Sequence, residues 1–228
     1  MLAERLIAEE LMDDPDLDPV TYQDVVHDLA RVNRITLAYR PTLAFLERAI
    51  GSKRRFSLLD VGFGDGDMLR RISRWARKNG IEAKLVGVDL NPRSEQAARS
   101  VRHSGRPIEY LTGDYADLAG DGFDCIVSSL VAHHMSRDEL IAFLRFMEAE
   151  AALGWFINDL HRHRVAYFFY PLLAGLMRWH PIVRHDGKTS IARSYRPGEW
   201  APLLAEADVR DAQVNRYFPY RLCVEKLQ

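Results

Sequence analysis

The sequence has few cysteines, and they are far apart. Cys125 and Cys223 are the only two among 228 residues. Two thiols are too few for the disulfide framework that stabilises many small secreted proteins. We interpret them as buried thiols of a protein that lies in the reducing cytoplasm.

Long apolar runs and a large excess of charge are also absent. The longest strongly apolar stretch, residues 165–177, has 13 residues, whereas a membrane-spanning helix needs about twenty. The N-terminus lacks a basic region followed by an apolar stretch and a cleavage site, so we expect no secretory signal. A formal net charge of -1 gives no general attraction for nucleic acid. The sequence therefore predicts a cytoplasmic globular protein with no nucleic-acid partner.

From residue 56 onward, short β-rich segments alternate with helical segments. The predicted strands of this region are 57–61, 84–88, 108–111, 123–128 and 155–158. The predicted helices between them are 67–78, 92–103 and 136–151, and Ser136 with Glu139 forms a capping box at the start of the last one. Strands that alternate with helices indicate a parallel sheet covered on both faces.

Helical patterns also stand at both ends of this region. The apolar residues at helical spacing near the start are Leu2, Leu6, Ile7, Leu11 and Met12. They predict a first helix, and helices at 19–31 and 38–50 complete an N-terminal helical part over residues 1–51. The chain ends with a helix at 197–207 and strands at 212–217 and 221–225, which we interpret as a β-hairpin.

A glycine-rich loop follows the first strand of the sheet. Residues 60–67 read Asp-Val-Gly-Phe-Gly-Asp-Gly-Asp, with three alternate glycines before a helix. Glycine lets the backbone approach a ligand closely, and the helix start supplies free N–H groups. A dinucleotide fingerprint would need a small residue where Asp67 stands, which counts against NAD or FAD.

The order of these motifs is similar to that of the S-adenosylmethionine-dependent methyltransferases of the Rossmann-like class. The first motif of that family is an acidic residue, a spacer and G-x-G-x-G, which Asp60, Gly62, Gly64 and Gly66 match. The resemblance continues through Asp89 after the second strand, Asp114 after the third and residues 123–130 of the fourth. These acids fall at successive strand ends, where open α/β sheets bind ligands.

The resemblance implies a doubly wound, mostly parallel seven-stranded sheet with a C-terminal antiparallel hairpin, in a methyltransferase domain at 52–228. It also implies S-adenosyl-L-methionine as cofactor. Asp89 would accept hydrogen bonds from the ribose hydroxyls, Asp114 would face the adenine amino group, and Asp60 would lie near the methionine amino group. The other expected cofactor-binding residues are Phe63, Leu90, Tyr115 and Ser129. The structural alternatives are a simple turn for the glycine loop, a helix cap for Asp89, a turn residue for Asp114, and core positions for Phe63 and Leu90.

Two histidines and an acid follow the next strands. His133 and His134 come after the fourth strand, and Asp159 ends the fifth. Family members that modify quinones and sugars commonly have this layout, which implies a histidine base oriented by the acid. We predict His133, rather than His134, as the base; a histidine that caps a helix or packs on the sheet is the alternative. His161 and His163 are weaker candidates, and no spacing favours a metal site, so we expect none.

Residues 160–196 are too long for an ordinary connection and are predicted to form a structured helical insertion. They contain seven Arg or Lys residues against Asp186, around the apolar stretch 165–177. Insertions at this place in the family form the acceptor pocket or its lid. An aromatic stretch with basic flanks favours a lipophilic or aromatic acceptor, and the alternatives are a buried packing helix or a weak membrane-surface contact.

These observations predict O-methylation of a hydroxyl on a small aromatic or lipophilic acceptor, as in bacterial secondary metabolism. Residues 158–162 and 183–187 are similar to bacterial enzymes of quinone or polyketide biosynthesis. The alternatives are C-methylation of a phenol or quinol ring, or a cofactor-binding partner protein without turnover. No Asn/Asp-Pro-Pro-Tyr motif of base methylation follows the fourth strand, where Ser128-Ser129-Leu130 stands. The sequence leaves the oligomeric state open.

Overall fold

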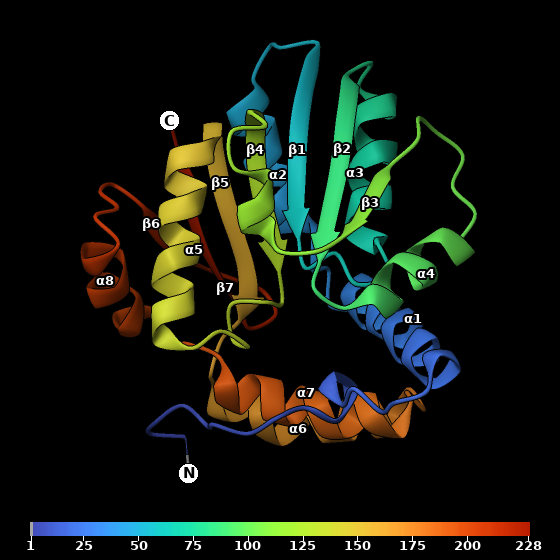
Figure 1. Cartoon of the computed structure of the whole chain (residues 1–228). Helices are drawn as coiled ribbons and strands as arrows, with labels where there is room; N and C mark the ends of the chain where they lie inside the picture. Colours follow the sequence, from blue (N-terminus) through green and yellow to red (C-terminus); the bar gives the residue numbers. More distant parts are fainter. Residues whose placement is uncertain (1) are drawn as a thin grey trace.

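The computed structural model describes residues 2–228, which form one twisted sheet between layers of helices (Figure 1). The sheet has seven strands in the order β3-β2-β1-β4-β5-β7-β6. The strands are β1 (Arg55–Val61), β2 (Glu82–Asp89), β3 (Glu109–Thr112), β4 (Phe123–Ser129), β5 (Ala151–Leu160), β6 (Gln213–Tyr217) and β7 (Arg221–Leu227). Strands β1 to β5 pair in parallel, and β7 runs antiparallel to both β5 and β6.

Helices cover the sheet on both faces. On one face α2 (Tyr39–Ile50) and α3 (Asp67–Lys78) bury Phe45, Leu46 and Ile72 against it. On the other face α5 (Arg137–Glu150) and α8 (Pro197–Glu206) bury a second apolar cluster that includes Trp200. The two clusters enclose the sheet, as a doubly wound fold requires, because central parallel strands are apolar on both faces.

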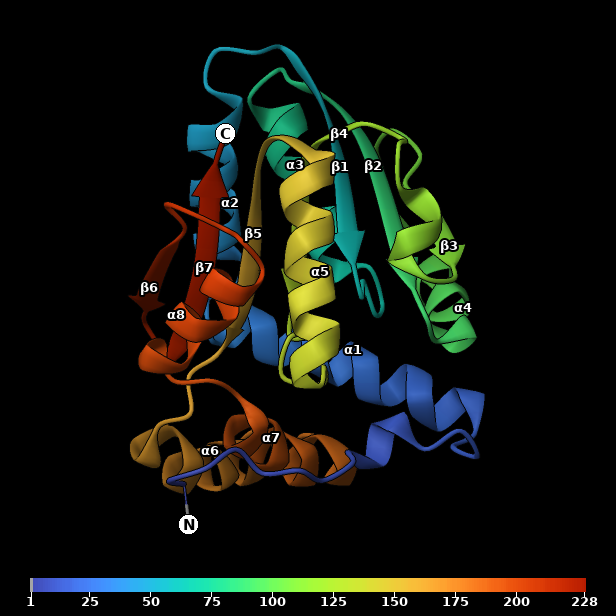
Figure 2. The same cartoon turned by 60° about the vertical axis from the view of Figure 1, so that its left-hand side comes forward.

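Three helices and the N-terminal segment lie across the carboxyl ends of the parallel strands (Figure 2). They are α1 (Pro19–Ile35), α6 (Arg164–Leu176) and α7 (Pro181–Arg193), and α4 (Pro92–Ser100) packs beside α1. Asp18 starts α1 by accepting hydrogen bonds from the N–H groups of Val20 and Thr21, and Pro19 occupies the first turn. This arrangement leaves a space between the sheet edge and the helices.

The predicted fold class is confirmed, including the C-terminal hairpin and a helical insertion at 160–196. The capping box of Ser136 and Glu139 begins α5 as predicted. Among residues 2–228, no helix has the length and apolar character needed to cross a membrane.

The predicted first helix is wrong. The segment before α1 is extended over residues 5–10 and then forms the short 3-10 helix η1 (Leu11–Asp13) and a turn at residues 15–16, and Ile7 is exposed. Its backbone binds α7 instead: Leu6 N–H donates to the Ala192 carbonyl oxygen, and the N–H groups of Leu11 and Met12 donate to the Asp186 carboxylate. Helical spacing of apolar residues did not decide the conformation, because α7 offers the segment tertiary partners. Helix α4 also ends at Ser100, three residues before its predicted end at 103.

Candidate active site

A cavity of about 570 Å³ lies between the carboxyl ends of the strands and helices α1, α6 and α7. One half is lined by the glycine loop and by residues at or just after the ends of β2, β3 and β4, including Asp89, Tyr115 and Ser129. The other half is lined largely by apolar side chains, such as Val25, Leu29 and Leu173. An apolar lining with a few polar groups at one side is typical of a site for small molecules.

The glycine loop needs glycine for conformation and for space. Gly62 has φ +74°, and a Cβ there would lie 2.3 Å from Val131 Cγ2. The loop is held against β2, because the Gly64 N–H donates to Asp89 Oδ2 at 2.9 Å and the Gly62 N–H donates to the Val88 carbonyl oxygen at 2.8 Å. Asp89 therefore orients the loop as well as lining the cavity.

Asp60 is a buried carboxylate in the cavity wall. It is 1 % exposed, and neither of its side-chain oxygens has a hydrogen-bond partner within residues 2–228. Burial, followed by the charges of Asp67 and Asp89, raises the pKa of Asp60 well above its usual range. An unpaired buried carboxylate is costly, so this side chain favours a ligand with a positive charge or several donors.

Arg221, at the start of β7, is the complementary group. It lines the cavity and is buried, and its Nη2 donates to Asn33 Oδ1 at 3.2 Å. Its Nη1 has no hydrogen-bond partner in the described part of the chain. A buried guanidinium with a free donor favours a carboxylate or phosphate. Sequence reasoning missed Arg221, because a cation in a C-terminal strand carries no local signal of a ligand.

The other expected cofactor residues divide into two groups. Ser129, Leu90 and Tyr115 line the cavity, and the Ser129 Oγ is buried without a partner among the described residues. Phe63 borders the cavity, but its ring is buried against Tyr110, with ring centroids 5.1 Å apart.

Asp114 lies outside the cavity lining. Its carboxylate accepts a hydrogen bond from the Ala116 N–H and caps the short 3-10 helix η2 (Tyr115–Leu118), while Gly113 and Tyr115 on either side line the cavity. The geometry favours its interpretation as a turn residue.

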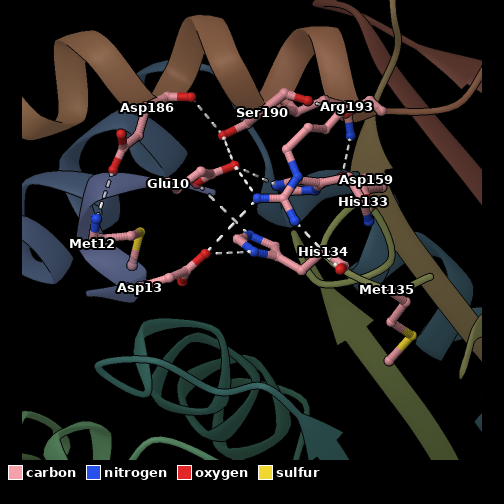
Figure 3. A network of polar contacts seen from close by, with 12 residues as sticks. Glu10, Met12, Asp13, His133, His134, Met135, Asp159, Asp186, Ser190 and Arg193 are labelled. Atoms are coloured by element: carbon pink, nitrogen blue, oxygen red, sulfur yellow. Dashed lines mark hydrogen bonds and ion pairs between the residues drawn. The ribbon is translucent and has the colours of Figure 1, made fainter. Parts of the chain in front are cut away.

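His133 and Asp159 form the pair that the sequence suggested. His133 Nδ1 lies 2.7 Å from Asp159 Oδ1, and the His133 backbone N–H donates to Asp159 Oδ2 at 2.9 Å (Figure 3). His133 Nε2 lies 3.5 Å from Glu10 Oε1. All three side chains are almost fully buried, so the imidazole is held between two carboxylates.

These two carboxylates determine the charge of the imidazole. Burial disfavours the cation, but Asp159 and then Glu10 outweigh it and raise the pKa of His133 to about 9. The imidazole in turn holds the pKa of both carboxyls below the usual range, against the effect of their burial. In this structure His133 is therefore a cation at neutral pH, and its Nε2 faces Glu10.

His134 belongs to the same network but is more accessible. Its Nδ1 lies 3.1 Å from Asp13 Oδ2, and its Nε2 lies 3.8 Å from Glu10 Oε2. The rings of the two histidines are 4.3 Å apart. Figure 3 shows Glu10 and Asp13 approaching the histidines from the N-terminal segment, opposite Ser190 and Arg193 of α7.

Sequence reasoning missed Glu10 and Asp13, which are two of seven acids among the first eighteen residues. Glu10 is 4 % exposed and accepts a hydrogen bond from Ser190 Oγ at 2.8 Å. Its burial follows from the extended path of the segment along α7, which the sequence did not predict. The only signal was an acid immediately before the apolar pair Leu11 and Met12.

Glu10, His133 and His134 also present donor atoms within 4.8 Å of one another. These donor types bind transition metals. However, Arg193 Nη1 lies 3.7 Å from Glu10 Oε1 and already supplies positive charge there. Metal independence therefore stays our prediction.

The weaker candidates lie outside the cavity lining. His161 is buried, and burial with the charge of Arg216 lowers its pKa to about 4. His163 caps α6 by accepting a hydrogen bond from the Val165 N–H, and its ring stacks on Tyr220. Both positions indicate structural roles.

Comparison with known proteins bears on the class of this fold and site. Residues 58–149 match the family described as "Methyltransferase domain". No curated protein sequence matches the chain.

Solved structures are similar to the whole chain at low sequence identity. The plantazolicin methyltransferase BpumL, in complex with a monoazolic desmethylPZN analog and SAH, is 13 % identical over 96 % of this chain and 99 % of its own, with TM-score 0.65. Human N-acetylserotonin methyltransferase in complex with SAM is 15 % identical over 98 % of this chain and 60 % of its own, with TM-score 0.68. A SAM-dependent methyltransferase from Aquifex aeolicus is 19 % identical over 93 % and 99 %, with TM-score 0.64.

The fold is thus that of the Rossmann-like α/β methyltransferases, and the resemblance expected from the motifs is confirmed. Within it, residues 58–149 match the methyltransferase-domain family, and the rest of the chain shares the fold of solved methyltransferases.

Proposed function

We propose that the protein transfers a methyl group from S-adenosylmethionine to a hydroxyl of a small lipophilic or aromatic acceptor. The observation that carries this proposal is one cavity that joins the glycine loop and Asp89 to the His133–Asp159 pair. A nucleophile in the apolar half would lie beside the cofactor half, and water would be largely excluded.

The polar half of the cavity fits the parts of S-adenosylmethionine. The amino-acid part of that molecule has an ammonium and a carboxylate group, and Asp60 and Arg221 offer buried oxygen and nitrogen atoms without partners that can bind these two groups. Asp89 would accept hydrogen bonds from the ribose hydroxyls with the lone pairs that the loop leaves free. The bound cofactor supplies a methyl group activated by a positively charged sulfur.

The apolar half of the cavity fits an acceptor with a hydrocarbon or aromatic body. Its lining comes from α1, α6 and α7 and includes Val26, Phe169, Tyr170 and Ile191. The fold is shared with methyltransferases that are named after plantazolicin, N-acetylserotonin and magnesium protoporphyrin IX. A labelling experiment can identify the acceptor.

The His133–Asp159 pair would remove the proton of the acceptor hydroxyl. The S–CH₃ bond of the cofactor would break as the O–CH₃ bond forms, which leaves S-adenosylhomocysteine, and the hydroxyl proton would pass to His133 Nε2 while Asp159 holds Nδ1. Because Nε2 faces Glu10, the acceptor hydroxyl has to replace Glu10 as its neighbour. His133 must also be neutral to accept the proton. We therefore expect the rate to rise with pH through the His133 pKa, which is raised to about 9 in the free protein.

Replacement of Glu10 by glutamine tests this role. Glu10→Gln removes one of the two charges that hold the proton on His133, so the midpoint of the rise of kcat/KM with pH should shift downward. His133→Ala should lose about 100- to 10,000-fold in kcat if the imidazole is the base. A pH profile that does not move in Glu10→Gln, together with near-normal kcat in His133→Ala, would exclude His133 as the base.

The acceptor and the methylated atom can be found in one experiment. Purified protein, S-adenosylmethionine with a labelled methyl group and a lipophilic cell extract should yield a labelled product with a mass gain of one methyl group. Magnetic resonance then shows whether the methyl is on oxygen or on a ring carbon. Transfer only to carbon would replace O-methylation by the C-methylation alternative, and no transfer with any extract would contradict the proposal.

A further inference from the structure

Helix α6 has an apolar face that the rest of the protein leaves uncovered. The face consists of Val165, Phe168, Phe169, Leu172, Leu173, Leu176 and Met177. These positions recur at helical spacing along the whole helix, and Phe168, Phe169, Leu172 and Leu176 are 62 %, 63 %, 68 % and 80 % exposed. The opposite side of α6 packs on α7 through Ala174 and through Tyr170, whose hydroxyl donates to the Val183 carbonyl oxygen. A continuous exposed apolar face of this size indicates an interaction surface.

Four cations lie close to α6, two at its ends and two on the side that packs on α7. Arg164 precedes the apolar face and Arg178 follows it on the chain. From α7, Lys188 Nζ lies 4.7 Å from the ring centre of Tyr167, and Arg184 reaches toward Gly175. Within residues 2–228, none of the four has a carboxylate within ion-pair distance. The only acid of α6 and α7, Asp186, is buried under the N-terminal segment.

The acidic N-terminal segment does not neutralise this surface, because it runs along α7. Leu6, Leu11 and Met12 bind α7 through their backbones, and Figures 1 and 2 both show the segment beside α7. The apolar face of α6 therefore stays open, with Arg164 and Arg178 at its two ends.

We propose that α6 docks the protein on the surface of an anionic lipid bilayer. An apolar helix face edged by Arg and Lys lies in the plane of the membrane interface, with its apolar side chains in the acyl boundary and its cations at the headgroups. The face offers no free polar side chain, whereas interfaces with proteins carry about one hydrogen bond per 100–200 Å². Since α6 has 13 residues and is about 20 Å long, it would lie on the bilayer and not cross it.

The same surface leads to the cavity. Phe169 and Leu173 belong to the exposed face and also line the cavity, so docking would place one wall of the acceptor half against the bilayer. This consequence, entry of the acceptor from the membrane, rests on the proposed function. The docking itself does not, because it is measured without methyl transfer.

Vesicle co-sedimentation tests the docking with a matched pair of variants. Leu172 and Val20 are 68 % and 67 % exposed, on α6 and α1, and neither lines the cavity. The full chain should sediment with phosphatidylglycerol–phosphatidylcholine vesicles, and less with phosphatidylcholine alone. Leu172→Glu should weaken binding at least about tenfold, Arg178→Gln by about fivefold, and Val20→Glu by less than about twofold. Unchanged S-adenosylhomocysteine affinity confirms that each variant is folded.

Three results would overturn the proposal. The first is wild-type protein that stays in the supernatant with anionic vesicles. The second is equal loss of binding in Leu172→Glu and Val20→Glu. The third is wild-type protein that does not bind vesicles but is a dimer in light scattering, and that becomes a monomer in Leu172→Glu. That result would assign the face to a second copy of the chain.

Discussion

The buried pair of carboxylates around His133 makes the stability of the protein depend on pH in a way that can be calculated. The folded protein holds the pKa of His133 at about 9, against 6.5 in the unfolded chain. Each unit of pKa difference is worth about 1.4 kcal/mol, so protonation of His133 contributes about 3 kcal/mol to the free energy of unfolding. This contribution is complete below pH 6.5 and decreases as pH rises, because the unfolded chain then loses the proton while the folded protein keeps it. Above pH 9 it is lost.

Denaturant unfolding at pH 6.5 and pH 9.5 measures this effect. The free energy of unfolding of wild type, minus that of His133→Gln, should fall by about 3 kcal/mol between these two pH values. His185→Gln, a change of an exposed histidine on α7, is the control and should follow wild type at both. If wild type and His133→Gln differ in free energy of unfolding by the same amount at pH 6.5 and pH 9.5, His133 is not held as a cation. The reasoning from Glu10 and Asp159 would then be refuted.

Four further predictions concern the cavity. Asp89→Ala should weaken S-adenosylhomocysteine binding by about 1.5 to 3 kcal/mol in calorimetry, because the ribose loses charge-assisted hydrogen bonds, and unchanged affinity would remove the ribose role. Arg221→Gln should weaken S-adenosylhomocysteine at least about tenfold but leave 5′-methylthioadenosine, which lacks the amino-acid part, unchanged; equal losses would point to a structural role of Arg221. Phe169→Ser should raise the acceptor KM while Phe168→Ser, at a similarly exposed residue outside the cavity, should not. Extensive chelation of divalent metal should leave kcat unchanged, and a loss restored by added metal would assign Glu10, His133 and His134 to a metal.

The sequence predicted the parts of the site that depend on strand order. Asp60, Asp89 and the His133–Asp159 pair come from strand ends of one parallel sheet, so the alternation of strands and helices was enough to place them at one edge. The glycine loop was also predictable, because the constraint on its backbone conformation is local. Asp114 shows the limit of this reasoning: an acid after a strand can cap a turn or bind a ligand, and the two leave the same pattern.

The parts that the sequence did not predict depend on contacts between distant segments. Glu10 reaches His133 only because the N-terminal segment is extended along α7, where Asp186 binds two consecutive backbone N–H groups. Apolar periodicity in that segment indicated a helix, and no local feature showed the competing partners. Arg221 likewise became a cavity residue through the pairing of β7 with β5, which brings it opposite Leu160.

The division of the site along the chain suggests how its functions are separated. Residues 58–149, the methyltransferase domain, supply the glycine loop, Asp89 and the two histidines. Glu10 and Asp159, which set the charge of His133, lie outside that range. Helices α6 and α7, which line the apolar half of the cavity, also lie outside it. If the proposed function holds, the methyl donor is bound mainly by residues 58–149, whereas the acceptor and the protonation of His133 depend on the segments before and after that range.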